Sequence, residues 1–351
     1  MRQLLLLLSI PVLFACEQMP PDELNDPCES GNFPQSGIAG DPSDRVWVIH
    51  EGNFQRGNAS LGWYEAATET WYPEVYDSLH QENLGDVFQS ITLAEDKAYL
   101  VINNSQKVIV ASASSGVKEG EITSLQSPRY LLPVSSDKAY VSDLYANAVS
   151  IIDLQDRQKT GQIRLPGWTE RMIQSGDKVF VTNLRSEYLY VIDPSTDQLI
   201  DSIRVGLGSS SVVEAADGTL WVACSGDVLN DVAGSLVQVD PLTMSVLQTF
   251  EFDGNERPSS LTTDPQGELL YFLNEDCFVM DMAADSLPSC PIIDAAGGLF
   301  YGLGIDPGNG DIYLADAIDY VQQGVLLRYA TDGVLLDEWR GGIIPSGFTF
   351  Q

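Results

Sequence analysis

Histidine, a common metal ligand and general base, is scarce in this sequence of 351 residues. Only two histidines, His50 and His80, are present, so the chain alone cannot supply a three-histidine metal site or two histidine ligands to a haem. No Gly-x-Ser-x-Gly elbow, His-Glu-x-x-His helix or phosphate-binding loop occurs. The sequence therefore favours a binding protein over an enzyme, with no cofactor and no metal.

A second group of residues is suited to holding a ligand through hydrogen bonds and flat contacts. These amides, acids, arginines and aromatics lie where predicted strands end or begin: His50, Asn53, Phe54, Phe88, Asn103, Arg129, Tyr130, Asp143, Trp168, Arg171, Asn183, Arg257, Asn274 and Tyr301. Gathered in a concave ring, they suit a flat, amide-rich or sugar-like ligand better than a bare anion. Each also has a structural interpretation, because amides can satisfy strand ends and aromatics can pack between repeats.

Four of these residues keep an enzyme open as an alternative. Propeller lactonases place Glu, Asn and Asp side chains around a calcium ion, and Asn103, Asp143, Asn183 and Asn274 could imitate that set. No Asp-x-Asp-x-Asp-Gly loop is present, however, so the sequence gives calcium no direct support. A Ca-dependent hydrolase or lactonase stays an alternative, as does a scaffold for protein–protein interaction.

The stretch from Trp168 to Gly208 is the unit that would position these residues. It contains four short β-type runs, Arg171–Gln174, Val179–Thr182, Tyr188–Ile192 and Leu199–Val205, separated by turn residues. A four-stranded meander of about 40 residues cannot bury both of its faces alone, so copies must stack.

Seven copies can be recognised by an aromatic residue at the centre of each second strand. These anchors are Trp47, Tyr99, Tyr140, Phe180, Trp221, Tyr271 and Tyr313. Their spacing of about 40 to 52 residues is typical of radial β-propellers. The sequence predicts an all-β fold, a seven-bladed β-propeller of four-stranded antiparallel blades over residues 45–351.

The ends of the chain indicate how the ring closes. No first-type strand precedes Trp47, whereas Pro345–Phe350 resembles the first-type strand Pro258–Thr263. We expect the C-terminal strand to complete the N-terminal blade, which removes free sheet edges.

Loop lengths separate the two faces of the predicted disc. The long connections are Glu51–Asn58, Asp77–Val87, Cys224–Gly234 and Ala315–Gln323, and all fall on one face. Insertions gathered on one face of a repeat protein are typical of a binding face, although neutral drift of surface loops gives the same pattern.

The N-terminal residues predict export and anchoring. Residues 1–15 read as a lipoprotein signal peptide, with an apolar run too short to span a bilayer. Leu13-Phe14-Ala15-Cys16 resembles a lipobox, with Cys16 as the lipidated residue; ordinary secretion is the alternative. Residues 16–44, acidic and rich in proline, predict a flexible tether after the lipidated cysteine.

Charge and cysteines add two expectations. With 50 acidic and 18 basic residues the formal net charge is −32, which argues against nucleic acid or anionic lipid as a partner. Four cysteines remain besides Cys16, an even number in an exported chain. Cys277 and Cys290 lie in the same repeat, and we expect a disulfide between them.

Several segments together resemble the YncE-like surface lipoproteins of Bacteroidota. They are His50–Phe54, Gly57–Leu61, Ser127–Tyr130, Lys138–Val141 and Gly167–Glu170. Some members of that family are seven-bladed propellers that capture cobalamin and pass it to a TonB-dependent transporter. The resemblance implies a lipid-anchored protein on the cell surface of the outer membrane that captures a corrinoid-like nutrient for such a transporter, without catalysis.

Overall fold

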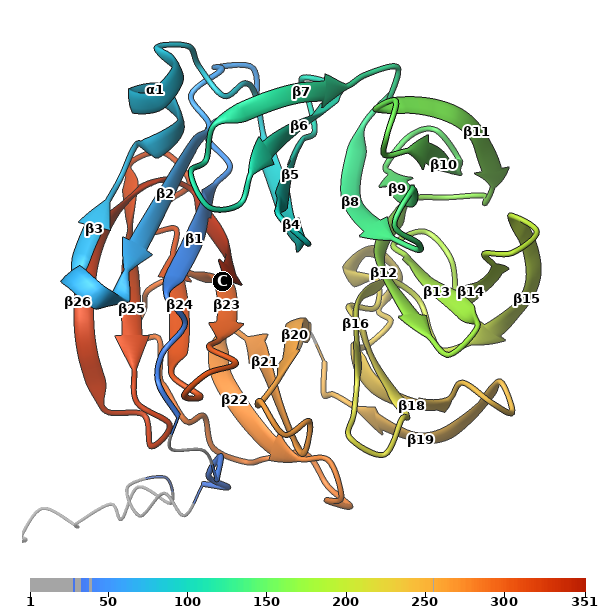
Figure 1. Ribbon diagram of the computed structural model, residues 1–351. Helices are drawn as coiled ribbons and strands as arrows, with labels where there is room; N and C mark the ends of the chain where they lie inside the picture. Colours follow the sequence, from blue (N-terminus) through green and yellow to red (C-terminus); the bar gives the residue numbers. More distant parts are fainter. Residues whose placement is uncertain (1–27, 29–32, 38–39, 255) are drawn as a thin grey trace, which may run out of the picture.

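The computed structural model describes residue 28 and residues 33–37, 40–254 and 256–351. Their strands form seven antiparallel sheets that stand side by side in a ring (Figure 1). The predicted all-β, seven-bladed propeller is therefore confirmed. The predicted signal peptide and Cys16 lie outside the described residues.

Blades are numbered along the chain, and their strands are given from the innermost outward. Blade 1 contains β27 (Pro345–Phe350), β1 (Arg45–His50), β2 (Ser60–Glu65) and β3 (Thr70–Tyr72). Blade 2 contains β4 (Phe88–Ala94), β5 (Lys97–Ile102), β6 (Lys107–Ser112) and β7 (Lys118–Ile122). Blade 3 contains β8 (Pro128–Pro133), β9 (Lys138–Asp143), β10 (Ala148–Asp153) and β11 (Gln158–Arg164).

The remaining blades follow the same order. Blade 4 contains β12 (Thr169–Ser175), β13 (Lys178–Asn183), β14 (Tyr188–Asp193) and β15 (Gln198–Arg204). Blade 5 contains β16 (Ser209–Glu214), β17 (Leu220–Cys224), β18 (Ser235–Asp240) and β19 (Ser245–Glu251). Blade 6 contains β20 (Ser259–Thr263), β21 (Leu269–Asn274) and β22 (Asp276–Asp281), and blade 7 contains β23 (Phe300–Ile305), β24 (Ile312–Asp316), β25 (Gln323–Tyr329) and β26 (Leu335–Ile343).

Two blades depart locally from the repeat. In blade 6 the outermost position is taken by a single bridge between Cys277 and Ile293 rather than by a regular fourth strand. After blade 1, the helix α1 (Val75–His80) occupies the start of the segment expected as the long loop Asp77–Val87. Short 3-10 turns, η1 (Ala66–Thr68) and η2 (Val228–Asn230), lie in two other connections. No helix in the described ranges is long and apolar enough to cross a membrane.

The seven aromatic anchors hold neighbouring blades together. Each is less than 9 % exposed, and each belongs to a different cluster of apolar side chains at a blade–blade interface. Trp47, for example, packs with Phe88 and Leu100 of blade 2, and Phe180 packs with Val222 of blade 5. The repeat spacing in the sequence is thus the spacing of the interfaces that bury the core.

The ring closes where the sequence predicted. Strand β27 pairs antiparallel with β1, so the C-terminal strand is the innermost strand of blade 1 (Figure 1). The seam is fastened further by Trp47 Nε1, which donates to Gln351 Oε1 at 3.2 Å, and by reciprocal backbone hydrogen bonds between Arg45 and Gln351.

The prediction of a flexible tether is wrong for its described part. Phe33 packs against the apolar cluster between blades 6 and 7. Ser36 Oγ donates to Gln266 Oε1 at 3.0 Å, and Ser43 Oγ donates to Asp306 Oδ1 at 2.7 Å. We call residues 28, 33–37 and 40–44 the strap. Its polar side chains bind Asp and Gln side chains in the propeller turns, which composition alone does not reveal.

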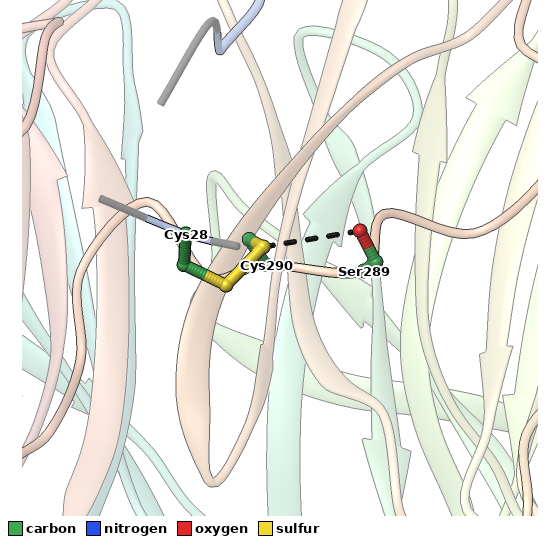
Figure 2. The surroundings of a disulfide bond; sticks show 3 residues. All are labelled: Cys28, Ser289 and Cys290. Carbon is green, nitrogen blue, oxygen red and sulfur yellow. Dashed lines mark hydrogen bonds between the residues drawn. A yellow bond between two sulfur atoms is a disulfide. The ribbon is translucent and has the colours of Figure 1, made fainter. Parts of the chain in front are cut away.

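The predicted Cys277–Cys290 disulfide is also wrong. Cys290 is bonded to Cys28 of the strap, across 262 residues of sequence (Figure 2). Cys277 lies buried as a free thiol among apolar residues, and burial raises its pKa above the ordinary range. Cys277 is the second residue of β22, and its side chain belongs to the core. Cys290 lies in the connection between blades 6 and 7, where Cys28 of the strap reaches it.

Replacing Cys290 with serine should lower the free energy of unfolding by about 2–4 kcal/mol, because the cross-link restricts the unfolded chain. Urea denaturation would measure the loss, and reducing the wild-type protein should reproduce it while leaving Cys290→Ser unaffected. Peptide mapping without reductant should recover Cys28 linked to Cys290. A peptide linking Cys277 to Cys290 would contradict the pairing.

Candidate binding site at the channel mouth

Every innermost strand carries a β-bulge close to its first residue. In each of the seven pairings the register shifts there by one residue relative to the second strand. A bulge bends the strand and re-aims its side chains. The residues at the bulges are Gln89, Arg129, Tyr130, Glu170, Arg171, Ser210, Ser260, Leu261, Tyr301 and Ser346.

All of these bulge residues line one cavity on the axis of the ring. Its volume is about 300 Å³, at the lower end of the range of about 300–1,000 Å³ for small-molecule sites. The cavity lies where the innermost strands begin. This end of the channel is on the face of the ring that carries the long loops, and we call that face the loop face. Apolar side chains such as Ile91, Leu303 and Phe348 line the cavity farther along the same strands. The bulges therefore place a polar ring above an apolar floor.

The polar ring contains a buried ion pair. Arg129 Nε donates to both carboxylate oxygens of Glu170, at 2.9 and 3.0 Å, and the Glu170 side chain is 3 % exposed. Burial raises the pKa of Glu170, and the adjacent guanidinium opposes that shift. Arg129 Nη1 also donates to Gln89 Oε1, and Gln89 Nε2 donates to Tyr130 Oη at 3.3 Å. This network fixes four neighbouring side chains before any ligand arrives.

Glu51 faces the same cavity from the end of β1. Burial raises the pKa of its carboxyl group to about 7, against the opposing effects of Arg129 and of the hydroxyl groups of Tyr301 and Ser346. Near neutral pH the site therefore holds one partly protonated carboxyl group, that of Glu51, close to Glu170, which is ion-paired with Arg129. Such a group can donate a hydrogen bond at one pH and accept one at another.

Replacing Glu51 with glutamine should remove a pH dependence of stability. In the folded state the Glu51 carboxyl group keeps its proton up to about pH 7, whereas a glutamate side chain in the unfolded chain loses its proton near pH 4.5. The folded state thus binds more protons in this window, and the free energy of unfolding falls as the pH rises from 4.5 through 7. At pH 8 we expect Glu51→Gln to be more stable than wild type by about 1–3 kcal/mol, since one pKa unit is about 1.4 kcal/mol.

Urea denaturation of both proteins between pH 5 and 8 would measure this, with the surface variant Glu95→Gln as control. The stability difference between Glu51→Gln and wild type should widen as the pH rises, while that of the control stays constant. A constant difference for Glu51→Gln would contradict the prediction.

A second hollow of about 480 Å³ adjoins the cavity, and Leu184 lines both. Its walls come from the loops of blades 4 and 5 and from the connection into blade 6, with Arg185, Asp227 and Arg257 among them. The Arg185 guanidinium carbon lies 4.1 Å from the centroid of the Trp168 ring. A ligand larger than either hollow can span both.

The structure brings only some of the predicted residues together. Arg129, Tyr130, Arg171 and Tyr301 line the cavity, and Arg257 lines the second hollow. Trp168 supports Arg185 beside that hollow. In the β1–β2 loop, Asn53 Nδ2 donates to Tyr320 O at 2.7 Å, and the Phe54 side chain is 64 % exposed.

The other predicted residues belong to the framework of the fold. Phe88 is fully buried in the apolar core. Burial lowers the pKa of His50 to about 3, and its Nδ1 pairs with Ser60 Oγ at 3.0 Å. Both are therefore corrected from ligand-binding to structural residues.

The strand-end amides and Asp143 have structural hydrogen-bond partners. Asn103 Nδ2 donates to Pro128 O, and Asp143 Oδ2 accepts from Ser127 N at 2.8 Å. Asn183 Oδ1 accepts from Trp168 N at 3.1 Å, and Asn274 Oδ1 accepts from Arg257 N at 2.9 Å. Each ties the end of a second strand to the segment entering an innermost strand, so these residues do not converge on a calcium site. Within the described ranges no group of three or more acidic, His or Cys side chains could hold a metal ion.

Sequence reasoning missed Glu51, Gln89, Glu170, Ser210, Ser260 and Ser346. The available signal was positional, because all but Glu51 lie one or two residues after the first residue of an innermost strand. The neighbouring site residues Arg129, Tyr130, Arg171 and Tyr301 could be predicted because arginine and aromatic side chains are typical of binding sites.

Comparisons with known proteins agree with the fold. Residues 44–322 match a family described as "Domain of unknown function (DUF5074)". A quinonprotein alcohol dehydrogenase-like protein from Bacteroides thetaiotaomicron is similar at a TM-score of 0.70 and 15 % identity, covering 88 % of this chain and 78 % of that one. A candidate 6-phosphogluconolactonase from Bacteroides fragilis is similar at 0.66 and 13 % identity, covering 89 % and 100 %. At such identities the likeness shows the fold alone, and no curated protein matches the sequence.

Proposed function

The chain belongs to the DUF5074 family, and on that premise we propose that it is a lipid-anchored binding protein that captures a nutrient at its channel mouth. The observation that carries this proposal is the ring of bulged residues, which gathers charged, amide and hydroxyl groups around one cavity. The Arg129–Glu170–Gln89–Tyr130 network holds part of this ring rigid, so a ligand would bind with little loss of conformational entropy.

The loop face supports a large ligand with apolar surface. The tips of its loops carry large apolar side chains that are mostly exposed: Phe54 at 64 %, Tyr145 at 53 %, Leu229 at 93 % and Val321 at 68 %. Exposed apolar groups around a polar cavity are typical of binding surfaces. The cavity is small enough to admit one polar side group, while the loop tips contact the body of the ligand. A corrinoid such as cobalamin, with amide groups around a flat ring, fits this description.

Calorimetry of residues 17–351 with cyanocobalamin tests the proposal. We expect saturable binding that Arg171→Ala weakens by about 1–3 kcal/mol, because Arg171 lies over the Tyr130 ring at 4.3 Å within the cavity. The matched control is Arg164→Ala on the outer strand β11, which should bind as wild type does. The absence of both heat and a spectral change at micromolar concentrations would reject the corrinoid as the ligand. Ca-dependent hydrolysis of lactones would favour the enzyme alternative over the binding protein.

The location is part of the proposal and has its own test. We propose that Cys16 is lipidated and that the protein faces outward from the outer membrane, where it passes its ligand to a TonB-dependent transporter. Cys16→Ala should release the protein from membranes or leave its leader uncleaved. Fractionation that finds the variant membrane-bound at mature size would contradict the anchor.

A further inference from the structure

Three arginines without ion pairs lie along the two adjoining hollows. Arg171 lines the axial cavity, and Arg185 and Arg257 line the second hollow. In the described part of the chain five other arginines form ion pairs, namely Arg45, Arg129, Arg157, Arg204 and Arg328. Six arginines of the described residues form no ion pair, and three of these six lie together along the two hollows, where we call them the arc.

Three carboxylates around the two hollows have hydrogen-bond partners outside the arc. Asp227 Oδ1 accepts from Leu229 N at 2.8 Å, and its Oδ2 accepts from Asn230 Nδ2 at 2.7 Å. Glu170 is held by Arg129. Glu256 accepts from Asn274 Nδ2 at 3.1 Å. None of these carboxylates forms an ion pair with the three arginines, although the charges of Asp227 and Arg185 and those of Glu170 and Arg171 attract each other, and Glu51 lines the same cavity as Arg171.

Arg257 is the most informative member of the arc. Its Nη1 donates to Gly254 O at 3.3 Å and to Glu256 O at 2.8 Å. Its Nε and Nη2 are buried and lack hydrogen-bond partners among the described residues. Unpaired buried donors are unfavourable, and the Nε–Nη2 edge of a guanidinium matches the two oxygens of a carboxylate or phosphate. Arg257 lines the second hollow, so this unpaired edge lies in a side chain that a ligand can reach.

Aromatic rings support the other two arginines. The guanidinium carbon of Arg185 lies 4.1 Å from the Trp168 ring centroid, and that of Arg171 lies 4.3 Å from the Tyr130 ring centroid. Stacking of this kind restricts the guanidinium plane and leaves the N–H groups at its edge available to an acceptor. Two of the three cations are thus partly ordered in advance.

We propose that Arg171, Arg185 and Arg257 form an anion subsite, which binds one carboxylate or phosphate group of the ligand captured at the channel mouth. The inference rests on the proposed binding function, and it differs from the expectation that the ring suits a flat, amide-rich or sugar-like ligand better than a bare anion. The surrounding negative charge repels anions at a distance, so recognition depends on the direct donors of the arc. Arg257 supplies a bidentate contact, and Arg185 and Arg171 supply charge from either side.

Titration of inorganic phosphate and of acetate into residues 17–351 tests the subsite, with binding followed by calorimetry at low ionic strength. We expect saturable binding of at least one anion, weakened at least tenfold in Arg257→Gln and in Arg185→Gln. Arg164→Gln removes the same charge from an exposed outer strand and should leave the affinity unchanged. The anion with the higher affinity identifies the group that the arc prefers. No saturable binding, or an equal loss in Arg164→Gln, would overturn the proposal.

A parallel titration with cyanocobalamin separates this inference from the proposed function. Anion binding that depends on Arg185 and Arg257, without corrinoid binding, would retain the subsite and reject the corrinoid. Corrinoid binding that both arginine variants leave unchanged would retain the captured ligand and reject the subsite.

Discussion

Removal of residues 345–351 is expected to prevent the protein from folding. The deletion takes away β27, which supplies the innermost strand of blade 1 and the whole hydrogen-bonded seam with β1. It also removes Phe348 and Phe350, whose rings lie 5.6 and 5.5 Å from that of Tyr313 in blade 7. Both rings are partly buried. Loss of a fully buried Phe side chain costs about 3–5 kcal/mol, so losing two partly buried ones together with a whole strand is large against a domain stability of only about 5–15 kcal/mol.

Circular dichroism and urea denaturation of the shortened chain would measure the loss. A synthetic peptide of residues 344–351 provides the control, because it can add the missing strand to the exposed edge of β1. We expect the peptide to restore a cooperative transition and a peptide with the same residues in scrambled order to have no effect. A shortened chain that melts cooperatively within a few degrees of the full one would contradict the closure.

Replacing Arg129 with leucine is expected to produce the second large effect. The substitution leaves the Glu170 carboxylate, 3 % exposed, without its partner, and breaking a buried ion pair in this way costs about 3–5 kcal/mol. The double variant Arg129→Leu/Glu170→Leu should recover most of that loss, because no buried charge is left uncompensated. Urea denaturation of the two single variants and the double variant forms a complete cycle.

The Arg204–Glu187 pair provides a matched control for this cycle. Its side chains are 70 % and 46 % exposed, so Arg204→Leu should change the free energy of unfolding by less than about 1 kcal/mol. A double variant no more stable than Arg129→Leu would show that the destabilisation comes from lost packing and not from the unpaired Glu170.

The fold could be predicted from the sequence because its determinants are local and repeated. Aromatic anchors such as Trp47 and Tyr313 recur once per blade, and each packs against the next blade. The C-terminal strand could be placed because its residues resemble those of another innermost strand. Both features can be recognised in the sequence without knowing the register between strands.

The site could be predicted only in part because it depends on that register. One extra residue at each bulge decides which side chains line the cavity. Glu170 and Arg171 both line it because of the bulge in β12, but the sequence predicts only Arg171 as a site residue. Asn183 and Asp143 looked equally suitable by type, but strand ends need partners for their backbone groups and recruit these side chains. The Cys28–Cys290 pairing joins residues far apart in sequence, and spacing carries no information about it.

The strap has a mechanical consequence for a protein held at its N-terminal end. A pull on the segment before Cys28 would be transmitted through the disulfide to Cys290, between blades 6 and 7, before it reached β1. The hydrogen bonds of Ser36 and Ser43 add two further points of attachment along the same path. The load therefore bypasses the β1–β27 seam, where peeling of one strand would open the ring. Reduction of the disulfide would leave the non-covalent contacts of the strap, those of Phe33, Ser36 and Ser43 among them, between an applied force and the seam.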